Sequence, residues 1–159
     1  MQVIIVEDHA FNAYCLTRLL QEVNPQVSIT VCASSSDLNH YLSQSTPDLI
    51  ILDGDLGAGD GLACNGPAVA DSLLQANKAV PLVVWTNSPA MRAAFSGVFA
   101  QYRLKLSEVN CWPKMVSTER ISHTLKTYSA NCQSKVAMSL PIPVRLRGKI
   151  SRHNLPRAQ

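Results

Sequence analysis

Three features are missing from the sequence, and each absence excludes a class of protein. Its 159 residues contain no apolar run near the ~18 residues that a membrane-spanning helix requires. No cationic and apolar leader opens the chain, so we expect a cytoplasmic protein with no membrane partner. The five cysteines are odd in number, widely separated and never in a CxxC pair. This pattern favours reduced thiols over a disulfide scaffold or a zinc site.

Acidic residues are missing from one end of the chain. Residues 129–159 contain six Lys or Arg and no Asp or Glu, whereas the preceding residues carry eight Lys or Arg against eleven Asp or Glu. The final segment also holds three prolines and shows no sustained helical or strand periodicity. The sequence therefore predicts one domain over residues 1–128, followed by a flexible basic tail over residues 129–159.

Within residues 1–128, strand-like and helix-like patterns alternate. Short apolar or alternating runs predict strands at 2–6, 27–32, 49–52, 81–85 and 109–112. Apolar residues at helical spacing predict helices within 9–23, 38–42, 68–77, 91–102 and 121–128. Strands that alternate with helices in this way predict an α/β fold: a doubly wound, five-stranded parallel sheet of the flavodoxin-like (βα)5 type. Such sheets bind ligands beyond the carboxyl ends of their strands.

Three carboxylates stand at the predicted strand ends. Glu7 and Asp8 directly follow the first strand, where Asp8 can also cap the next helix, and Asp53 directly follows the third. Those strands are neighbours in a sheet of this kind, so we expect the three acids to meet in one pocket. Three adjacent negative charges repel one another unless a hard divalent cation relieves the repulsion. The sequence thus predicts a Mg²⁺ site.

Two further residues complete a reactive set. Thr86 ends the fourth strand with a hydroxyl, and Lys114 follows the fifth strand with an ammonium group. Both can reach the mouth of the acidic pocket. A nucleophilic carboxylate, a metal ion, a hydroxyl and a cation together form a site suited to phosphoryl transfer.

These motifs resemble those of the receiver domains of two-component response regulators, the CheY-like superfamily. The resemblance covers about residues 1–128 and rests on VIIVED at the start, PDLIILD ending at Asp53, VVWT ending at Thr86, the late Lys114, and Asp60-Gly61 in the loop after Asp53. It implies that Asp53 accepts a phosphoryl group from a phosphohistidine on a sensor histidine kinase or a phosphotransfer protein. A receiver is a phosphoprotein that modifies itself, so no turnover of an external substrate is expected.

The resemblance also assigns roles to the other residues of the site. It implies that Asp8 binds Mg²⁺ directly, that Glu7 binds it through water and that the backbone carbonyl of Asp55 completes the metal shell. Thr86 and Lys114 would contact the phosphoryl oxygens. Phosphorylation would then change the face formed by the fourth helix and fifth strand, the output surface of the family, which would contact a downstream protein. A second copy of the chain, in a homodimer, is left open as another partner.

Several positions depart from the family pattern. Pro113 precedes Lys114, whereas the family usually has proline after its lysine, and Asn87 follows Thr86 where a very small residue is usual. Gly57 replaces a common proline. These departures leave open a second hypothesis, a degenerate receiver that binds proteins without phosphorylation. A third hypothesis is that the basic tail binds nucleic acid.

Overall fold

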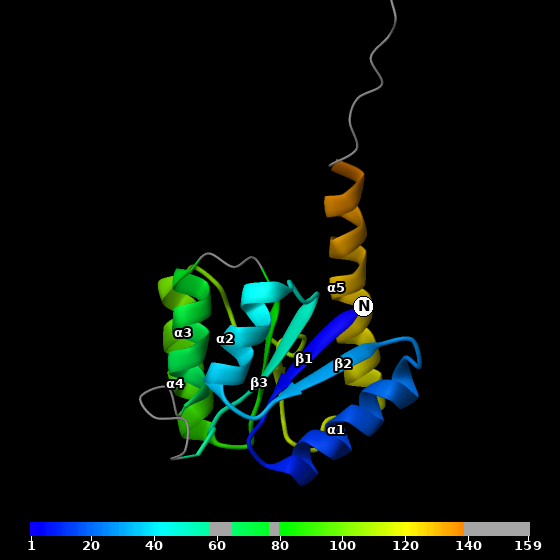
Figure 1. Ribbon diagram of the computed structural model, residues 1–159. Coiled ribbons are helices and arrows are strands. Elements are labelled where there is room, and N and C mark those ends of the chain that lie inside the picture. Colours follow the sequence, from blue (N-terminus) through cyan, green and yellow to red (C-terminus); the bar gives the residue numbers. More distant parts are fainter. Residues whose placement is uncertain (58–64, 77–79, 139–159) are drawn as a thin grey trace, which may run out of the picture.

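The computed structural model describes residues 1–57, 65–76 and 80–138, and the side chains of these ranges as far as residue 130. Strands and helices alternate along the chain (Figure 1). The strands are β1 (Gln2–Val6), β2 (Ser28–Cys32), β3 (Leu49–Asp53), β4 (Leu82–Trp85) and β5 (Cys111–Trp112). The helices are α1 (Ala10–Val23), α2 (Ser35–Gln44), α3 (Gly66–Gln75), α4 (Pro89–Gln101) and α5 (Thr118–Met138).

The strands form one five-stranded sheet in the order β2-β1-β3-β4-β5, and every pairing is parallel. This order confirms the predicted doubly wound, flavodoxin-like α/β fold. In the central pairs, Val6 lies beside Leu52 and Asp53 lies beside Trp85. The ends of β1, β3 and β4 are therefore level with one another, which places the residues that follow them at one edge of the sheet.

Helices cover both faces of the sheet, with α1 and α5 on one face and α2, α3 and α4 on the other (Figure 1). Successive residues of β1 alternate between the two cores: Ile4 and Val6 pack towards α2–α4, whereas Val3 and Ile5 pack towards α1 and α5. Because both faces are covered, the central strands read as continuous apolar runs. All five residues of β3 are buried.

Side-chain caps explain where three helices begin. Ser34, Asn65 and Ser88 each accept a hydrogen bond from a backbone N–H in the first turn of α2, α3 and α4. The prediction that Asp8 caps α1 is wrong. The N-cap of that helix is His9, which makes no capping bond with its side chain, and the Asp8 carboxylate lies instead beside those of Glu7 and Asp53.

The last helix extends past the predicted domain boundary. Helix α5 ends at Met138 rather than at Tyr128 and continues beyond the sheet (Figure 1). Residues 139–159 lie outside the described residues, so the division into a domain over 1–128 and a flexible tail over 129–159 stays a prediction. Among the described helices, none combines the length and the apolar character needed to cross a bilayer.

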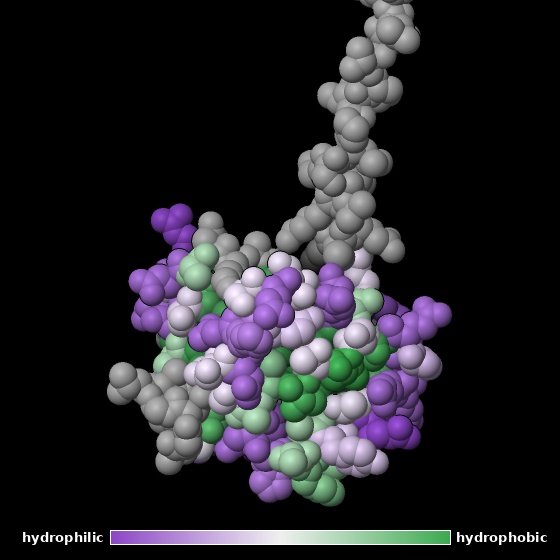
Figure 2. Space-filling view, in the orientation of Figure 1, coloured by the Kyte–Doolittle hydropathy of each residue, from purple (hydrophilic) through white to green (hydrophobic). Residues whose placement is uncertain are grey.

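The two edge strands differ in their exposure. Hydrophobic residues form a band over β2 (Figure 2), where the side chain of Val31 is 46% exposed. At the other edge, β5 has only two residues and Trp112 is buried. The sheet therefore ends two residues before Lys114, which has to be positioned by other contacts.

Candidate functional site

The predicted acids meet at the carboxyl edge of the sheet. Glu7 follows β1, Asp8 comes next, and Asp53 is the last residue of β3. One carboxylate oxygen from each of them lies within 4.8 Å of the other two. This arrangement confirms that residues 45 or more positions apart in the chain share one pocket, as parallel strands with level ends require.

Lys114 reaches the pocket from the residues that follow the edge strand β5. Its Nζ lies 2.8 Å from Asp53 Oδ1 and also forms an ion pair with Glu7 Oε2. The side chain of Lys114 is 22% exposed, whereas those of Glu7 and Asp53 are 1% and 8% exposed. The lysine thus provides a positive charge for two buried carboxylates. A buried carboxylate needs such a partner, because an unpaired buried charge is strongly destabilising.

The pKa of Asp53 is raised above its ordinary value, and burial is the main cause because it penalises the charged form. The hydrogen bond and the positive charge of Lys114 act in the opposite direction, and the negative charge of Glu7 adds to the rise. The backbone N–H of Gly54 also donates to Asp53 Oδ1 over 2.6 Å. Asp53 is therefore a carboxylate that is poorly hydrated yet held by donors, as suits a nucleophile.

Glu7 is held by two contacts, one from α1 and one from His9, the residue that precedes α1. Its Oε1 accepts hydrogen bonds from the backbone N–H of His9 at 3.1 Å and from Asn12 Nδ2 at 3.5 Å. Oε2 remains for Lys114. The orientation of Glu7 is thus determined by two segments of the chain.

Thr86 presents its hydroxyl to the same pocket. The residue is 4% exposed, and its Oγ1 accepts a hydrogen bond from the backbone N–H of Ser88 at 3.2 Å. Because the oxygen already serves as an acceptor, the hydroxyl proton can be donated into the cavity. Gly54 makes room for this hydroxyl, since a Cβ at that position would lie 2.8 Å from Thr86 Oγ1.

Gly57 forms a cradle for Asp8. Its φ angle is +71°, in the left-handed region that favours glycine, and an added Cβ would lie 2.6 Å from Asp8 Oδ2. The side chain of Asp55 is exposed and accepts the backbone N–H of Gly57 at 3.1 Å. Glycine at position 57 thus leaves room for the Asp8 carboxylate, one of three adjacent carboxylates that together offer the oxygen donors that suit Mg²⁺. The carbonyl of Asp55 as a ligand stays a prediction.

The pocket has a volume of about 370 Å³. It brings together all the predicted site residues among the described ones, whereas Asp60-Gly61 lies outside the described residues. The sequence reasoning missed several members of its wall: His9, Asn12, Ser88 and Met91. The sequence does indicate Ser88 as a helix cap, because Ser followed by Pro is a common start of a helix.

Asn87 and Pro113 do not displace Lys114. The Asn87 side chain is turned to the loop that follows β5, where its Oδ1 accepts the backbone N–H of Lys114 at 2.8 Å. Trp112, two residues before the lysine, is buried and donates to Thr124 Oγ1 at 3.2 Å. The reversed order of Pro113 and Lys114 is therefore compatible with a lysine that reaches Asp53.

We compared the chain with protein-family models, curated proteins and solved structures. The family model for the response regulator receiver domain matches residues 3–105. No curated protein matches the chain. Among solved structures, 224 chains match.

Three of these structures illustrate the likeness. The receiver domain of a DNA binding response regulator (merR) from Colwellia psychrerythraea is 17% identical, with a TM-score of 0.64, over 82% of this chain and 98% of that one. The N-terminal domain of a response regulator/sensory box/GGDEF protein from Carboxydothermus hydrogenoformans is 18% identical, with a TM-score of 0.64, over 86% and 99%. The receiver domain of NtrX from Brucella abortus is 13% identical, with a TM-score of 0.60, over 79% and 96%. At these identities the structures support the fold.

Proposed function

The chain belongs to the response regulator receiver domain family, and on this premise we propose that it accepts a phosphoryl group on Asp53 in a Mg²⁺-dependent reaction. The observation that carries the proposal is the position of Asp53, buried beside Glu7 and Asp8 with its Oδ1 2.8 Å from Lys114 Nζ. A receiver domain is not an enzyme in the usual sense, and the family implies a histidine kinase as the partner.

The proposed reaction transfers the group from a phosphohistidine. A carboxylate oxygen of Asp53 attacks phosphorus, a P–O bond forms, and the N–P bond to the donor imidazole breaks. The bonding electrons stay on the imidazole nitrogen. Asp53 has to be ionised to attack, and Lys114 favours that form against the effect of burial.

The surrounding residues supply positive charge and donors for the transferred group. Glu7, Asp8 and Asp53 would hold Mg²⁺, which supplies charge stabilisation for the phosphoryl oxygens. Lys114 Nζ and the Thr86 hydroxyl stand on the wall of the same cavity. Both can hold a phosphoryl oxygen, because each offers a proton to the cavity.

The proposed output is a change in protein contacts. Phosphorylation places about −1.5 to −2 charges where the single charge of the Asp53 carboxylate stood, and the added negative charge attracts Thr86 and Lys114. Thr86 leads into α4 and Lys114 follows β5. We therefore assign the switching surface to the α4–β5 face, with a downstream protein as its target.

Direct phosphorylation tests the proposal. Incubation with acetyl phosphate and Mg²⁺ should add one phosphoryl group, detected by mass, and Asp53→Ala should abolish the addition. Asp48→Asn is the matched control, because Asp48 precedes the same strand at its opposite end and accepts the backbone N–H of Gln2 at 2.7 Å. Absence of Mg²⁺-dependent addition to the unmodified chain would contradict the proposal.

One observation favours a second candidate, a binding module that works without phosphorylation. Lys114 already forms ion pairs with Glu7 and Asp53, so a side chain of the protein itself compensates part of their negative charge. Titration with Mg²⁺ separates the candidates: chemical-shift changes confined to the acidic pocket support the phosphoryl acceptor, whereas no response at millimolar Mg²⁺ supports the binding module.

A further inference from the structure

Lys114 reaches Asp53 although the sheet does not hold it. Strand β5 ends at Trp112, and the backbone N–H of Thr86 donates to the carbonyl of Trp112 at 3.0 Å. Lys114 lies two residues further along the chain, beyond that bond. A long side chain on an unsupported backbone loses conformational entropy when it is confined to one position, so other contacts have to compensate for that loss.

Two side chains that flank Thr86 provide those contacts. Asn87 Oδ1 accepts the backbone N–H of Lys114 at 2.8 Å. Trp85 Nε1 donates to the backbone carbonyl of Lys114 at 3.3 Å. The indole ring of Trp85 also lies under the ammonium group, with Lys114 Nζ 4.0 Å from the ring centroid.

We propose that Trp85 and Asn87 are positioning residues that together hold Lys114 at Asp53, an inference that rests on the proposed phosphoryl transfer. Each polar group of the Lys114 backbone is bonded by one of them, so the peptide units before and after its Cα are both held. The three residues from Trp85 to Asn87 therefore supply the hydroxyl of Thr86 and also place the ammonium group.

Both positioning residues are themselves held. Trp85 is 3% exposed and packs in the core between the sheet and the α1–α5 layer. The backbone carbonyl of Asn87 accepts a hydrogen bond from Arg92 Nη2 at 3.1 Å, which ties it to α4. Trp85 is therefore held by core packing, whereas Asn87 is exposed and held through its backbone.

The indole ring of Trp85 gives the Lys114 ammonium group a favourable contact in addition to its ion pairs with carboxylates. A cation over the face of tryptophan is attracted by the ring quadrupole, and the attraction increases when water is excluded. Lys114 can thus stay beside Asp53 when the oxygen atoms of Glu7 bind another cation. Leucine or valine at position 85 would fill the core without offering this contact.

NMR spectroscopy of the whole chain tests the placement directly. Protons above an indole ring are shifted upfield, so the ε-methylene of Lys114 should resonate apart from those of the other lysines. Asn87→Ala should move this resonance towards theirs and accelerate exchange of the Lys114 amide proton. Asn87→Asp keeps the acceptor oxygen and should restore the amide protection. Asn24→Ala removes an amide at the opposite end of α1, where it accepts the backbone N–H of Gln26, and should leave both signals in place.

Kinetics then separate this inference from the proposed function. With saturating acetyl phosphate and Mg²⁺, Asn87→Ala should slow phosphoryl addition roughly 3- to 10-fold, as expected for loss of one hydrogen bond. Trp85→Phe keeps a ring but loses the N–H donor, so it should reduce the rate and retain part of the upfield shift. Circular dichroism confirms that each variant is folded.

Two results would overturn the inference. One is a Lys114 ε-methylene that resonates with the other lysines in the unmodified chain, and the other is a resonance that Asn87→Ala leaves unchanged. If the unmodified chain takes up no phosphoryl group, the proposed function fails, while the NMR signals still decide whether Trp85 and Asn87 hold Lys114.

Discussion

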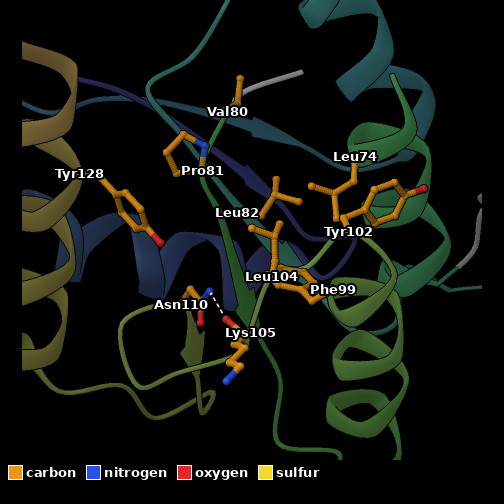
Figure 3. A pocket seen from close by; sticks show the side chains of 10 residues that line it. All are labelled: Leu74, Val80, Pro81, Leu82, Phe99, Tyr102, Leu104, Lys105, Asn110 and Tyr128. Carbon is orange, nitrogen blue, oxygen red and sulfur yellow. Dashed lines mark hydrogen bonds between the residues drawn. The ribbon is translucent and has the colours of Figure 1, made fainter. Parts of the chain in front are cut away.

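At its carboxyl end, β4 leads through Thr86 into a cavity of about 370 Å³ whose wall includes carboxylates and a lysine. At its amino end, the residues from Val80 to Leu82 border a cavity of about 460 Å³. Most side chains around this second cavity are hydrophobic, with Tyr128 on one side and Phe99 and Tyr102 on the other (Figure 3). One four-residue strand therefore connects two regions of opposite chemistry.

The residues at the amino end of β4 contribute to the stability of the fold, whereas those at its carboxyl end form the reactive site. Apolar side chains at the amino end contribute to the core and stabilise the fold by burial. At the carboxyl end, burial raises the pKa of Asp53, which means that the ionised form is less favourable in the fold than in water. Substitutions at the two ends should consequently affect different properties, which leads to four predictions.

The largest effect is expected at the amino end. Phe99 is 2% exposed and borders the hydrophobic cavity, so Phe99→Ala should lower the free energy of unfolding by about 3–5 kcal/mol. Urea denaturation measures this loss. The Mg²⁺ affinity of the folded variant should stay within roughly twofold of the original, since distant sites are usually independent. A large loss of affinity would show that the two ends are coupled.

At the carboxyl end, Gly57→Ala should affect stability and binding together. An alanine held at φ +71° costs about 1–2 kcal/mol. Its Cβ would displace Asp8, and we expect a roughly 10-fold weaker Mg²⁺ affinity by analogy with the loss of a supporting group. The matched control is Gly97→Ala on α4, where a Cβ meets nothing within 4 Å. That control should leave Mg²⁺ affinity intact and stabilise the fold by about 0.4–1 kcal/mol.

Binding of Mg²⁺ should itself stabilise the protein. At a concentration ten times Kd the free energy of unfolding should rise by about 1.4 kcal/mol, because the ion binds the folded chain only. Asp8→Asn should remove most of this increase, as it deletes one of the three adjacent carboxylates. An equal increase in Asp8→Asn would place the bound ion outside the acidic pocket.

The smallest effect concerns Cys32, which ends β2 at the same edge of the sheet but is buried among apolar residues. Burial, with a smaller contribution from Asp37, raises the pKa of this thiol to about 11. The thiolate fraction at pH 8 is then about one in a thousand. Iodoacetamide should therefore alkylate Cys32 far more slowly in the folded chain than in urea, as mass spectrometry of the peptide can show.

The same shift has a consequence for stability. Because the folded pKa lies above the value of 9.0 for the free thiol, the unfolded chain loses its proton first as pH rises. Stability should decline between about pH 9 and 11 through this group. Rapid alkylation of Cys32 in the folded chain at pH 8 would contradict both expectations.

The meeting of Glu7, Asp8 and Asp53 could be predicted from the sequence, because the apolar runs before them identify buried parallel strands. Parallel strands place their carboxyl ends at one edge, so acids that follow two neighbouring strands have to meet. The identity of the fold followed from the same local periodicity. Caps such as Ser88 were also readable, since they act within a few residues of the chain.

The contacts that position Lys114 could be found only in the tertiary structure. Whether Asn87 blocks the pocket or bonds the backbone of Lys114 depends on the path of two loops, and no local pattern determines the distance between them. The same is true of the start of α1, which Asp8 does not cap, and of Gly57, whose missing Cβ makes room for Asp8. Periodicity along a chain specifies which faces are buried, whereas contacts between loops depend on how the finished core brings distant segments together.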